Sequence, residues 1–320
     1  MPGILAHYAF AKRYLPEEEL PWEEAVLAGT QGPDPFMAYG SNPLRPRKDK
    51  KDVNPWGELM HHTPIENVYG PMLSEAQKAE GEQREFLFAY LDGLLMHFSL
   101  DRIVHPYVFY RTGFDENGKY AGIYIYYHGF FETLIDESIA KKDGLFIRPD
   151  KAMGQLSKKQ QAWASKLWKD TATVPLKETA FEESYREYNQ VSRLLWSKKG
   201  IKRALLKPLL GAKSKPYSLI YPPSLKPFEA LDILNESHSA WKDPVSGEER
   251  LSSVEDLFEQ AHQDFLEVHG WLLKAKQGKD VTLDLKDWAK NLDHDGTPFG
   301  STKKYYSKEI LPLSDNVKAT

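Results

Sequence analysis

The feature that most constrains the fold is a long apolar segment crossed by evenly spaced polar groups. Residues 83–104 carry a helical pattern of apolar side chains, which is densest over 86–100. His97, Asp101 and His105 follow one another at intervals of four, so on a helix they project from one face. Desolvating three such groups costs free energy unless a partner satisfies them. A divalent cation would do so, and a hydrogen-bonded His–Asp–His ladder is the alternative.

The segment 120–140 repeats this arrangement. We expect a helix from about Ile123, on which His128 and Glu132 lie one turn apart. The pair is a weak signal alone, but it supplies a second row of ligands facing the first. Asp136, one turn further along, is interpreted as a carboxylate that orients a ligand histidine. An exposed aspartate is the alternative.

Further candidate ligands precede these two helices. Asp34 lies in the Gly-Pro-Asp-Pro loop at 32–35, which fixes the direction of its carboxylate, and an ordinary turn is the alternative. His61 and His62 are adjacent, and the sequence does not decide which of them is a ligand. The chain has no cysteine, so a metal site must be built from His, Asp, Glu and backbone groups.

No segment shows a convincing alternation of apolar and polar residues, so we predict an all-α fold. Helices are predicted at 7–15, at 83–104 with an end near His105, from Ile123 to about 140, and at 156–170, 178–198, 253–276 and 282–291. Loops are predicted at 29–57 and 198–227. His262 and His269 share a helix face, where packing is expected and a further metal is the alternative.

Composition narrows the classes of function. Hydrophobic residues make up 41% and charged residues 28% of the 320 positions, an ordinary globular balance. A net charge of −4 at pH 7 argues against a protein that coats nucleic acid. The N-terminal segment does not resemble a secretory signal, and the apolar run at 86–100 is too short and polar to span a bilayer. We therefore expect a cytoplasmic protein.

Residues 193–215 form a basic segment with eight lysines and arginines and no acidic residue, interleaved with leucines and Trp196. Such a segment fits peripheral contact with an anionic lipid surface. It equally fits contact with a nucleic-acid backbone. A core-facing helix with a solvated basic face is the third interpretation.

Five short stretches together resemble the bacterial zinc-dependent phospholipase C family, whose all-helical fold is shared with fungal single-strand-specific nucleases. They are MPGILAHYAF, GTQGPDPF, ELMHH, HFSLDRIVHPY and HGFFETLID, in the family's order within roughly the first 140 residues. The resemblance implies a multi-helix bundle around a cluster of up to three zinc ions. It assigns 1–190 to the zinc-binding catalytic core, and 191–320 to a basic connection and C-terminal helices packed on the same domain.

The resemblance also implies a ligand set, position by position. The first zinc would be held by Asp34, His61 (or His62), His97 and Asp101, with Asp101 bridging to a partner zinc. That partner zinc would take His7 and, if Met1 is removed, the free amine of Pro2; a partly buried helix histidine is the alternative for His7. The third, more separate zinc would take His105, His128 and Glu132.

Such a centre implies hydrolysis of a phosphodiester by a metal-activated water, with Asp34 and Asp101 as the catalytic carboxylates and Asp34 as proton acceptor. The substrate would be a phosphodiester, with a phospholipid favoured by the basic segment. Alternatives are a nuclease or nucleotidase of the same fold, or a non-catalytic metal-binding or membrane-associated protein. Asp101 and His105 are closer in sequence than in the family, and Pro35 replaces an aromatic residue, so specificity for phosphatidylcholine does not carry over. His238 and His294 receive no role.

Overall fold

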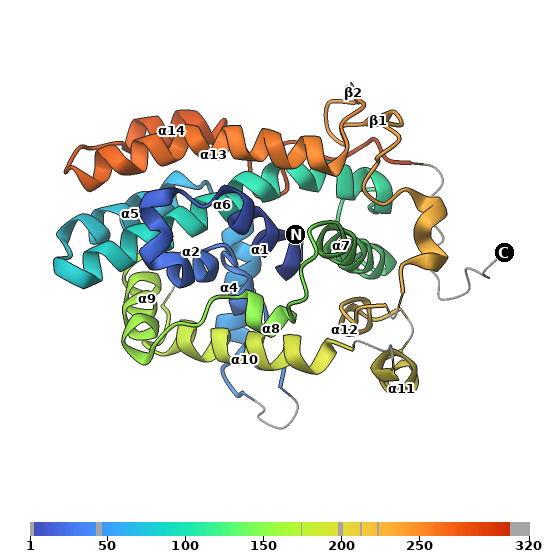
Figure 1. Ribbon diagram of the computed structural model, residues 1–320, viewed down its shortest axis with the longest axis horizontal. Coiled ribbons are helices and arrows are strands. Elements are labelled where there is room, and N and C mark those ends of the chain that lie inside the picture. The colour runs from blue at the N-terminus through green and yellow to red at the C-terminus, as the bar shows by residue number, and fades with distance from the viewer. Residues whose placement is uncertain are drawn as a thin grey trace.

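The computed structural model describes residues 3–42, 47–173, 175–197, 201–211, 213–222 and 224–307. Across these residues the secondary structure is almost entirely helical, which confirms the predicted all-α class (Figure 1). The first half contains α1 (Ile4–Tyr14), η1 (Glu17–Trp22), α2 (Glu23–Gly29), α3 (Asp34–Met37), α4 (Lys50–His61), α5 (Glu66–Lys78), α6 (Gly81–Thr112), α7 (Ile123–Lys142) and α8 (Pro149–Ala152). The second half contains α9 (Lys158–Thr171), α10 (Ala180–Leu195), α11 (Ile201–Leu210), α12 (Lys215–Ser218), η2 (Lys226–Leu231), α13 (Val254–Lys276) and α14 (Thr282–Ala289). The strands β1 (Trp241–Lys242) and β2 (Glu249–Arg250) form a small antiparallel ribbon.

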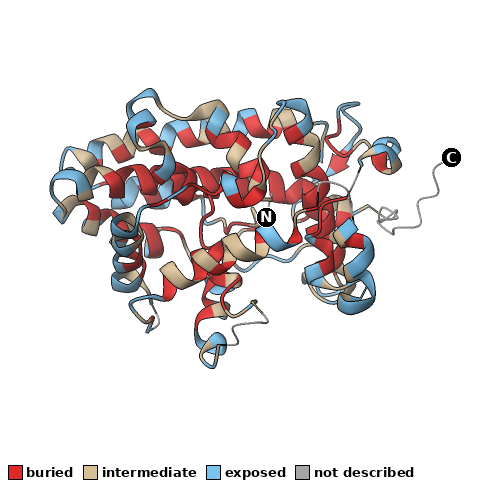
Figure 2. Ribbon diagram, turned by 60° about the horizontal axis from the view of Figure 1, so that its bottom comes forward, coloured by how far each residue is buried: buried red, intermediate tan, exposed pale blue. Residues whose placement is uncertain are grey.

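Helix α6 is the centre of the molecule. It packs against α2 and α13 along its length and also contacts α5, α7 and α9. Figure 1 shows α13 beside α6 on one side of the molecule and α10 on the opposite side. Buried residues are concentrated on the inner helices (Figure 2), and those of both halves of the chain join in one core. None of the described helices has the length and apolar character needed to cross a membrane.

The predicted end of this helix near His105 is wrong, because α6 continues through Pro106 to Thr112. A proline inside a helix removes one hydrogen-bond donor and crowds the preceding turn. The next turn carries Tyr107, Val108 and Phe109, all of them buried. Burying three large side chains contributes more free energy than the proline costs, so the helix is not interrupted.

Two glycines allow α2 to lie directly on α6. A Cβ atom on Gly29 would come within 2.8 Å of the Cα of Gly93, and one on Gly93 would come within 2.7 Å of the Cα of Gly29. Larger residues would hold the two helices apart. This close crossing positions the loop that follows α2, and with it Asp34, against the face of α6 that carries His97.

The predicted loop at 29–57 is wrong in two places, because Asp34 begins the short helix α3 and α4 begins at Lys50. Val53, Trp56 and Met60 are buried at helical spacing, but Pro55 and the charged start of the helix obscure this pattern in the sequence. The predicted loop at 198–227 likewise contains α11 and α12. Helices α2 and α5 were also not predicted.

A buried ion pair joins α13 to α6. Nδ1 of His269 lies 2.7 Å from Asp92, and Nε2 lies 3.1 Å from Glu18. Burial opposes protonation, but the two carboxylates raise the pKa of His269 to about 9. His262, on the same helix, stacks on Tyr14 with ring centroids 4.0 Å apart. Both histidines therefore have packing partners within the fold.

We predict that His269→Gln lowers the free energy of unfolding at pH 6 by about 3 kcal/mol, because it leaves buried Asp92 without its partner. The pKa of His269 is raised on folding, so its protonation stabilises the fold fully below about pH 6.5. That contribution is lost as the pH rises through about 9. Urea unfolding at pH 6, 7.5 and 9.5 should therefore show the difference from wild type shrinking. His262→Gln is the control and should cost less; a difference independent of pH for His269→Gln would contradict the ion pair.

Candidate metal centre

Three groups of buried His, Asp and Glu side chains gather around α6. In each group the nearest candidate ligand atoms lie within 4.8 Å of one another. The groups are His7, His97 and Asp101; Asp34, His61 and His97; and His105, His128 and Glu132. Every predicted ligand that the structure describes thus lies in one of these groups. Pro2 falls outside the described residues.

The first two groups share His97, and Asp101 lies between two imidazoles. One carboxylate oxygen of Asp101 is 3.2 Å from Nε2 of His7, and the other is 3.1 Å from Nε2 of His97. In the second group Oδ1 of Asp34 is 3.2 Å from Nε2 of His61. A carboxylate that offers each oxygen to a different site has the form of a bridging ligand.

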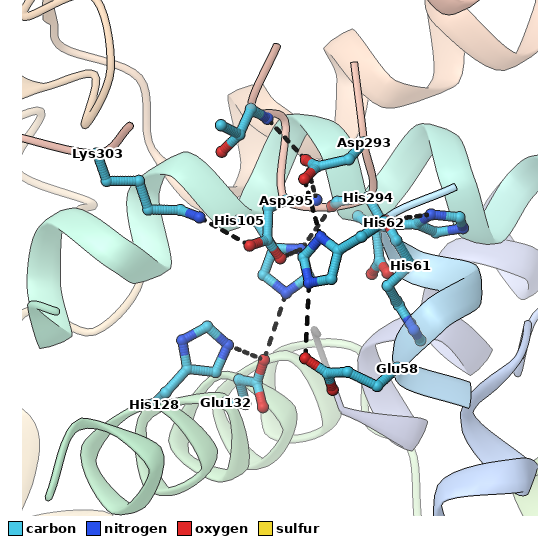
Figure 3. Close-up of polar contacts among 12 residues, drawn as sticks. Glu58, His61, His62, His105, His128, Glu132, Asp293, His294, Asp295 and Lys303 are labelled. Atoms are coloured by element: carbon cyan, nitrogen blue, oxygen red, sulfur yellow. Dashed lines mark hydrogen bonds and ion pairs between the residues drawn. The ribbon is translucent and has the colours of Figure 1, made fainter. Parts of the chain in front are cut away.

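His61, rather than His62, belongs to the centre. His61 is buried within the second group. The His62 side chain is 44% exposed, and it pairs with Asp293 at 3.0 Å and with Glu58 at 3.5 Å. These contacts with Asp293 and Glu58 raise the pKa of His62 to about 10, so it is a cation on the rim of the centre (Figure 3).

The third group is built by α6 and α7. Oε1 of Glu132 lies 2.9 Å from Nε2 of His128 and 3.6 Å from Nε2 of His105 (Figure 3). The two imidazole rings are stacked with centroids 5.5 Å apart. The four-residue spacing of His128 and Glu132 therefore places both side chains opposite His105, as the sequence predicts.

Three of the imidazoles carry their proton on the same ring nitrogen. In each, Nδ1 contacts a backbone carbonyl oxygen, which can only accept a hydrogen bond. The contacts are His61 to Gly57 at 2.6 Å, His97 to Thr30 at 3.0 Å and His105 to His294 at 2.7 Å. Nδ1 is therefore the protonated nitrogen, and the lone pair of Nε2 faces the carboxylates. Metal-bound histidines are usually held in this way.

The inward-facing atoms of the centre have no hydrogen-bond partner within the described part of the chain. These buried atoms are Nε2 of His61, His97 and His105, Oδ1 of Asp34, and both carboxylate oxygens of Asp101. Each buried polar atom left in this way costs about 1–3 kcal/mol. Nitrogen and oxygen donors around one point are what zinc accepts in proteins. The residues present therefore fit a cluster of divalent metal ions.

Burial sets the charge state of most of these groups. It lowers the pKa of His105 to about 4, and it lowers the pKa values of His7 and His128. Burial alone would raise the pKa of Asp101, but His97 and His105 hold it well below its usual range. Burial also opposes protonation of His97, yet the Asp101 carboxylate raises its pKa.

Asp136 does not orient a histidine, and it is not exposed. Its carboxylate accepts hydrogen bonds from the backbone N–H groups of Leu5 at 3.0 Å and Ala6 at 2.9 Å, and from the Tyr221 hydroxyl at 2.5 Å. It therefore caps the first turn of α1. Through this cap, Asp136 fixes the helix that delivers His7, so both interpretations of Asp136 from the sequence were wrong.

His294 belongs to the centre, although sequence reasoning gave it no role. Its backbone N–H donates to the carbonyl of His61 at 3.1 Å, and its own carbonyl accepts from His105. Its ring centroid lies 4.8 Å from that of His61 and 5.6 Å from that of His97. The segment after α14 thus links the second and third groups. No spacing signal connects His294 to the ligands, which all precede it by more than 160 positions.

A fourth group, His62, Asp293 and Asp295, is more exposed than the other three. Asp295 forms an ion pair with Lys303 at 2.8 Å (Figure 3). Because His62 and Lys303 are both cations here, the two aspartates already have partners of opposite charge. This group forms a charged network at the rim and differs in this respect from the buried groups.

Comparison of the chain with family models, with curated proteins and with solved structures finds no match.

We predict that Gly32→Ala weakens zinc binding about tenfold to a hundredfold, the usual effect of a change in a residue that positions a metal ligand. Gly32 has φ +53°, and a Cβ there would lie 2.6 Å from Cγ of the His97 ring. Gly81 also has φ +53°, but a Cβ there has nothing within 4 Å. Gly81→Ala is therefore the matched control, with a similar backbone cost of about 1 kcal/mol and unchanged zinc affinity. Competition with a chromophoric chelator measures both, and equal affinities would contradict this role of Gly32.

Proposed function

We propose that this protein is a zinc-dependent phosphodiester hydrolase that resembles the bacterial phospholipase C family. One observation carries the proposal. Three buried imidazoles each donate Nδ1–H to a backbone carbonyl and direct Nε2 toward a buried carboxylate. His61 faces Asp34, His97 faces Asp101 and His105 faces Glu132, and none of the three Nε2 atoms has a hydrogen-bond partner among the described residues. The zinc ligands would be His7, Asp34, His61, His97, Asp101, His105, His128 and Glu132, with Pro2 as the ligand that the resemblance adds.

The charge of the centre favours an anionic substrate. The three groups contain three carboxylates, from Asp34, Asp101 and Glu132, and the lowered pKa values of His7, His105 and His128 keep those imidazoles neutral. Without cations this centre would repel a phosphodiester. Three divalent ions would add six positive charges to three negative ones, so the loaded centre would attract it.

The chain's own residues supply orientation and proton transfer. Bound zinc ions would provide positive charge for the phosphate oxygens and lower the pKa of the attacking water. Oδ1 of Asp34 is buried and has no hydrogen-bond donor among the described residues, so it can accept the proton of that water. The carbonyls of Thr30, Gly57 and His294 keep the imidazoles in one tautomer throughout. The absence of cysteine is consistent with direct attack by water.

We predict that protein purified without chelator carries about three zinc ions per chain, the number that the three groups would hold. Asp101→Asn should lose about two of them, because Asp101 touches ligands of both neighbouring groups. His128→Ala should lose about one, from the third group alone. His262→Ala is a control histidine outside the groups and should lose none. Elemental analysis and native mass spectrometry give the counts; wild-type protein that stays free of zinc after incubation with the metal would refute the centre.

We also predict that Asp34→Asn lowers the hydrolysis of bis(4-nitrophenyl) phosphate about a hundredfold or more, the usual contribution of a positioned general base. His105, His128 and Glu132 do not contact Asp34, so zinc in the third group should persist in this variant. Initial rates at saturating zinc measure the effect. A zinc-loaded wild-type protein that hydrolyses neither this ester nor single-stranded nucleic acid nor phospholipid would instead support a non-catalytic metal protein.

A further inference from the structure

Helix α11 has apolar side chains on two faces. Leu206 and Leu210 are partly buried against the core, and a second set faces solvent. Ile201, Leu205 and Leu209 follow one another at intervals of four and therefore form one stripe along the helix. Their side chains are 58%, 66% and 78% exposed. A surface helix of a globular protein normally turns such a stripe toward the core. Large apolar residues aligned on an outer face indicate a partner.

The orientation of α11 is fixed by a buried arginine. Arg203 is 6% exposed, and its guanidinium donates to the carbonyl of Ile220 at 2.6 Å. The same group lies over the rings of Phe130 and Tyr217 at 4.2 and 4.5 Å. A guanidinium that stacks and donates in this way is a strong anchor. Because Arg203 faces inward, the stripe faces outward as a consequence of defined contacts.

Positive charge surrounds the stripe. Lys207, Lys213 and Lys215 are exposed, and Lys202 is half-buried. The sequence has no acidic residue between Arg193 and Phe228. Basic residues beside an exposed aliphatic stripe are the pattern of a helix that lies in the interface of an anionic bilayer.

We propose that α11 and the lysines around it dock this protein on anionic lipid membranes, with Ile201, Leu205 and Leu209 inserted among the lipid headgroups. Binding to a nucleic-acid backbone would use the lysines but would leave three aliphatic side chains in water. Pairing with a second copy through this face would bring like charges together. A bilayer with anionic lipids would bury the apolar stripe and attract the lysines.

The docking helix is connected through α12 to α7, the helix that carries two ligands of the third group. Figure 1 shows α11 at the edge of the molecule with α12 beside it. Helix α12 packs on α7, where the hydroxyl of Thr133 donates to the carbonyl of Ser218 at 3.1 Å. Thr133 follows Glu132 of the third group in sequence. The docking helix is therefore joined through α12 to the helix that carries Glu132.

Co-sedimentation of the full chain with vesicles of phosphatidylcholine containing phosphatidylserine tests the docking. We expect binding that weakens as salt is added and that is at least about tenfold weaker with phosphatidylcholine alone. Leu205→Ser with Leu209→Ser should lower binding about tenfold or more. Leu283→Ser is the matched control, because Leu283 is 77% exposed on α14, and it should leave binding unchanged. Circular dichroism verifies that each variant is folded.

Three outcomes would overturn the proposal. These are no binding to anionic vesicles, binding that the stripe variant leaves intact, and loss in that variant only of dimerisation or of single-stranded oligonucleotide binding. Asp101→Asn should bind vesicles as wild type does, since docking does not require zinc. Vesicle binding without hydrolysis in zinc-loaded wild type would therefore contradict the proposed reaction and leave the docking surface in place. Hydrolysis of a soluble ester without vesicle binding would support the proposed reaction and contradict the docking surface.

Discussion

The candidate metal centre depends on one costly placement, a carboxylate inside the long, almost fully buried part of α6. Asp101 has no exposed surface, and its two oxygens face His7 and His97. A buried charge is tolerated only when opposite charges or donors surround it. Helix α6 supplies His97 and His105 one turn before and one turn after Asp101, and α1 brings His7 to the remaining side. The packing of α1 on α6 thus surrounds this carboxylate with imidazole nitrogens, an arrangement that a bound cation would complete.

The groups that contact the candidate ligands from behind fix the orientation of those ligands. The carbonyls that hold the imidazoles come from the loop after α2, from α4 itself and from the segment after α14. The carbonyls of Thr30 and His294 lie outside regular helices, where carbonyl oxygens are not used by helical hydrogen bonds. The carbonyl of Gly57 lies within α4. Asp136 acts similarly on α1, because it caps the helix that carries His7. A change in any of these supports would move a ligand without removing it.

The sequence predicts the fold class, the longer helices and the inner ligands for related reasons. Helix α13 has a clear apolar face, whereas α6 and α7 are long segments that are apolar on all sides. His97, Asp101, His128 and Glu132 are visible in the sequence because they follow the four-residue spacing of a helix. Prediction from the sequence fails where contacts between distant segments decide the local structure. The helix through Pro106 continues because the following residues are buried, and α4 forms although proline and charge dominate its start. His294 is held at the centre by backbone hydrogen bonds, which cannot be predicted from residue types, so the sequence gives it no role.

The buried face of helix α11 also could not be predicted from the sequence. Its sequence alternates leucines and basic residues, and periodicity alone assigns the leucines to the core. In the structure Leu206 and Leu210 pack on the core, and Arg203 is buried with them because two aromatic rings and the carbonyl of Ile220 contact its guanidinium. Ile201, Leu205 and Leu209 are left on the outer face. Which face of an amphipathic helix turns inward is therefore decided by the surface it meets. Here that surface is made by Phe130 of α7, Tyr217 of α12 and the carbonyl of Ile220, so one of the contacts that orient α11 lies on the helix that carries the third metal group.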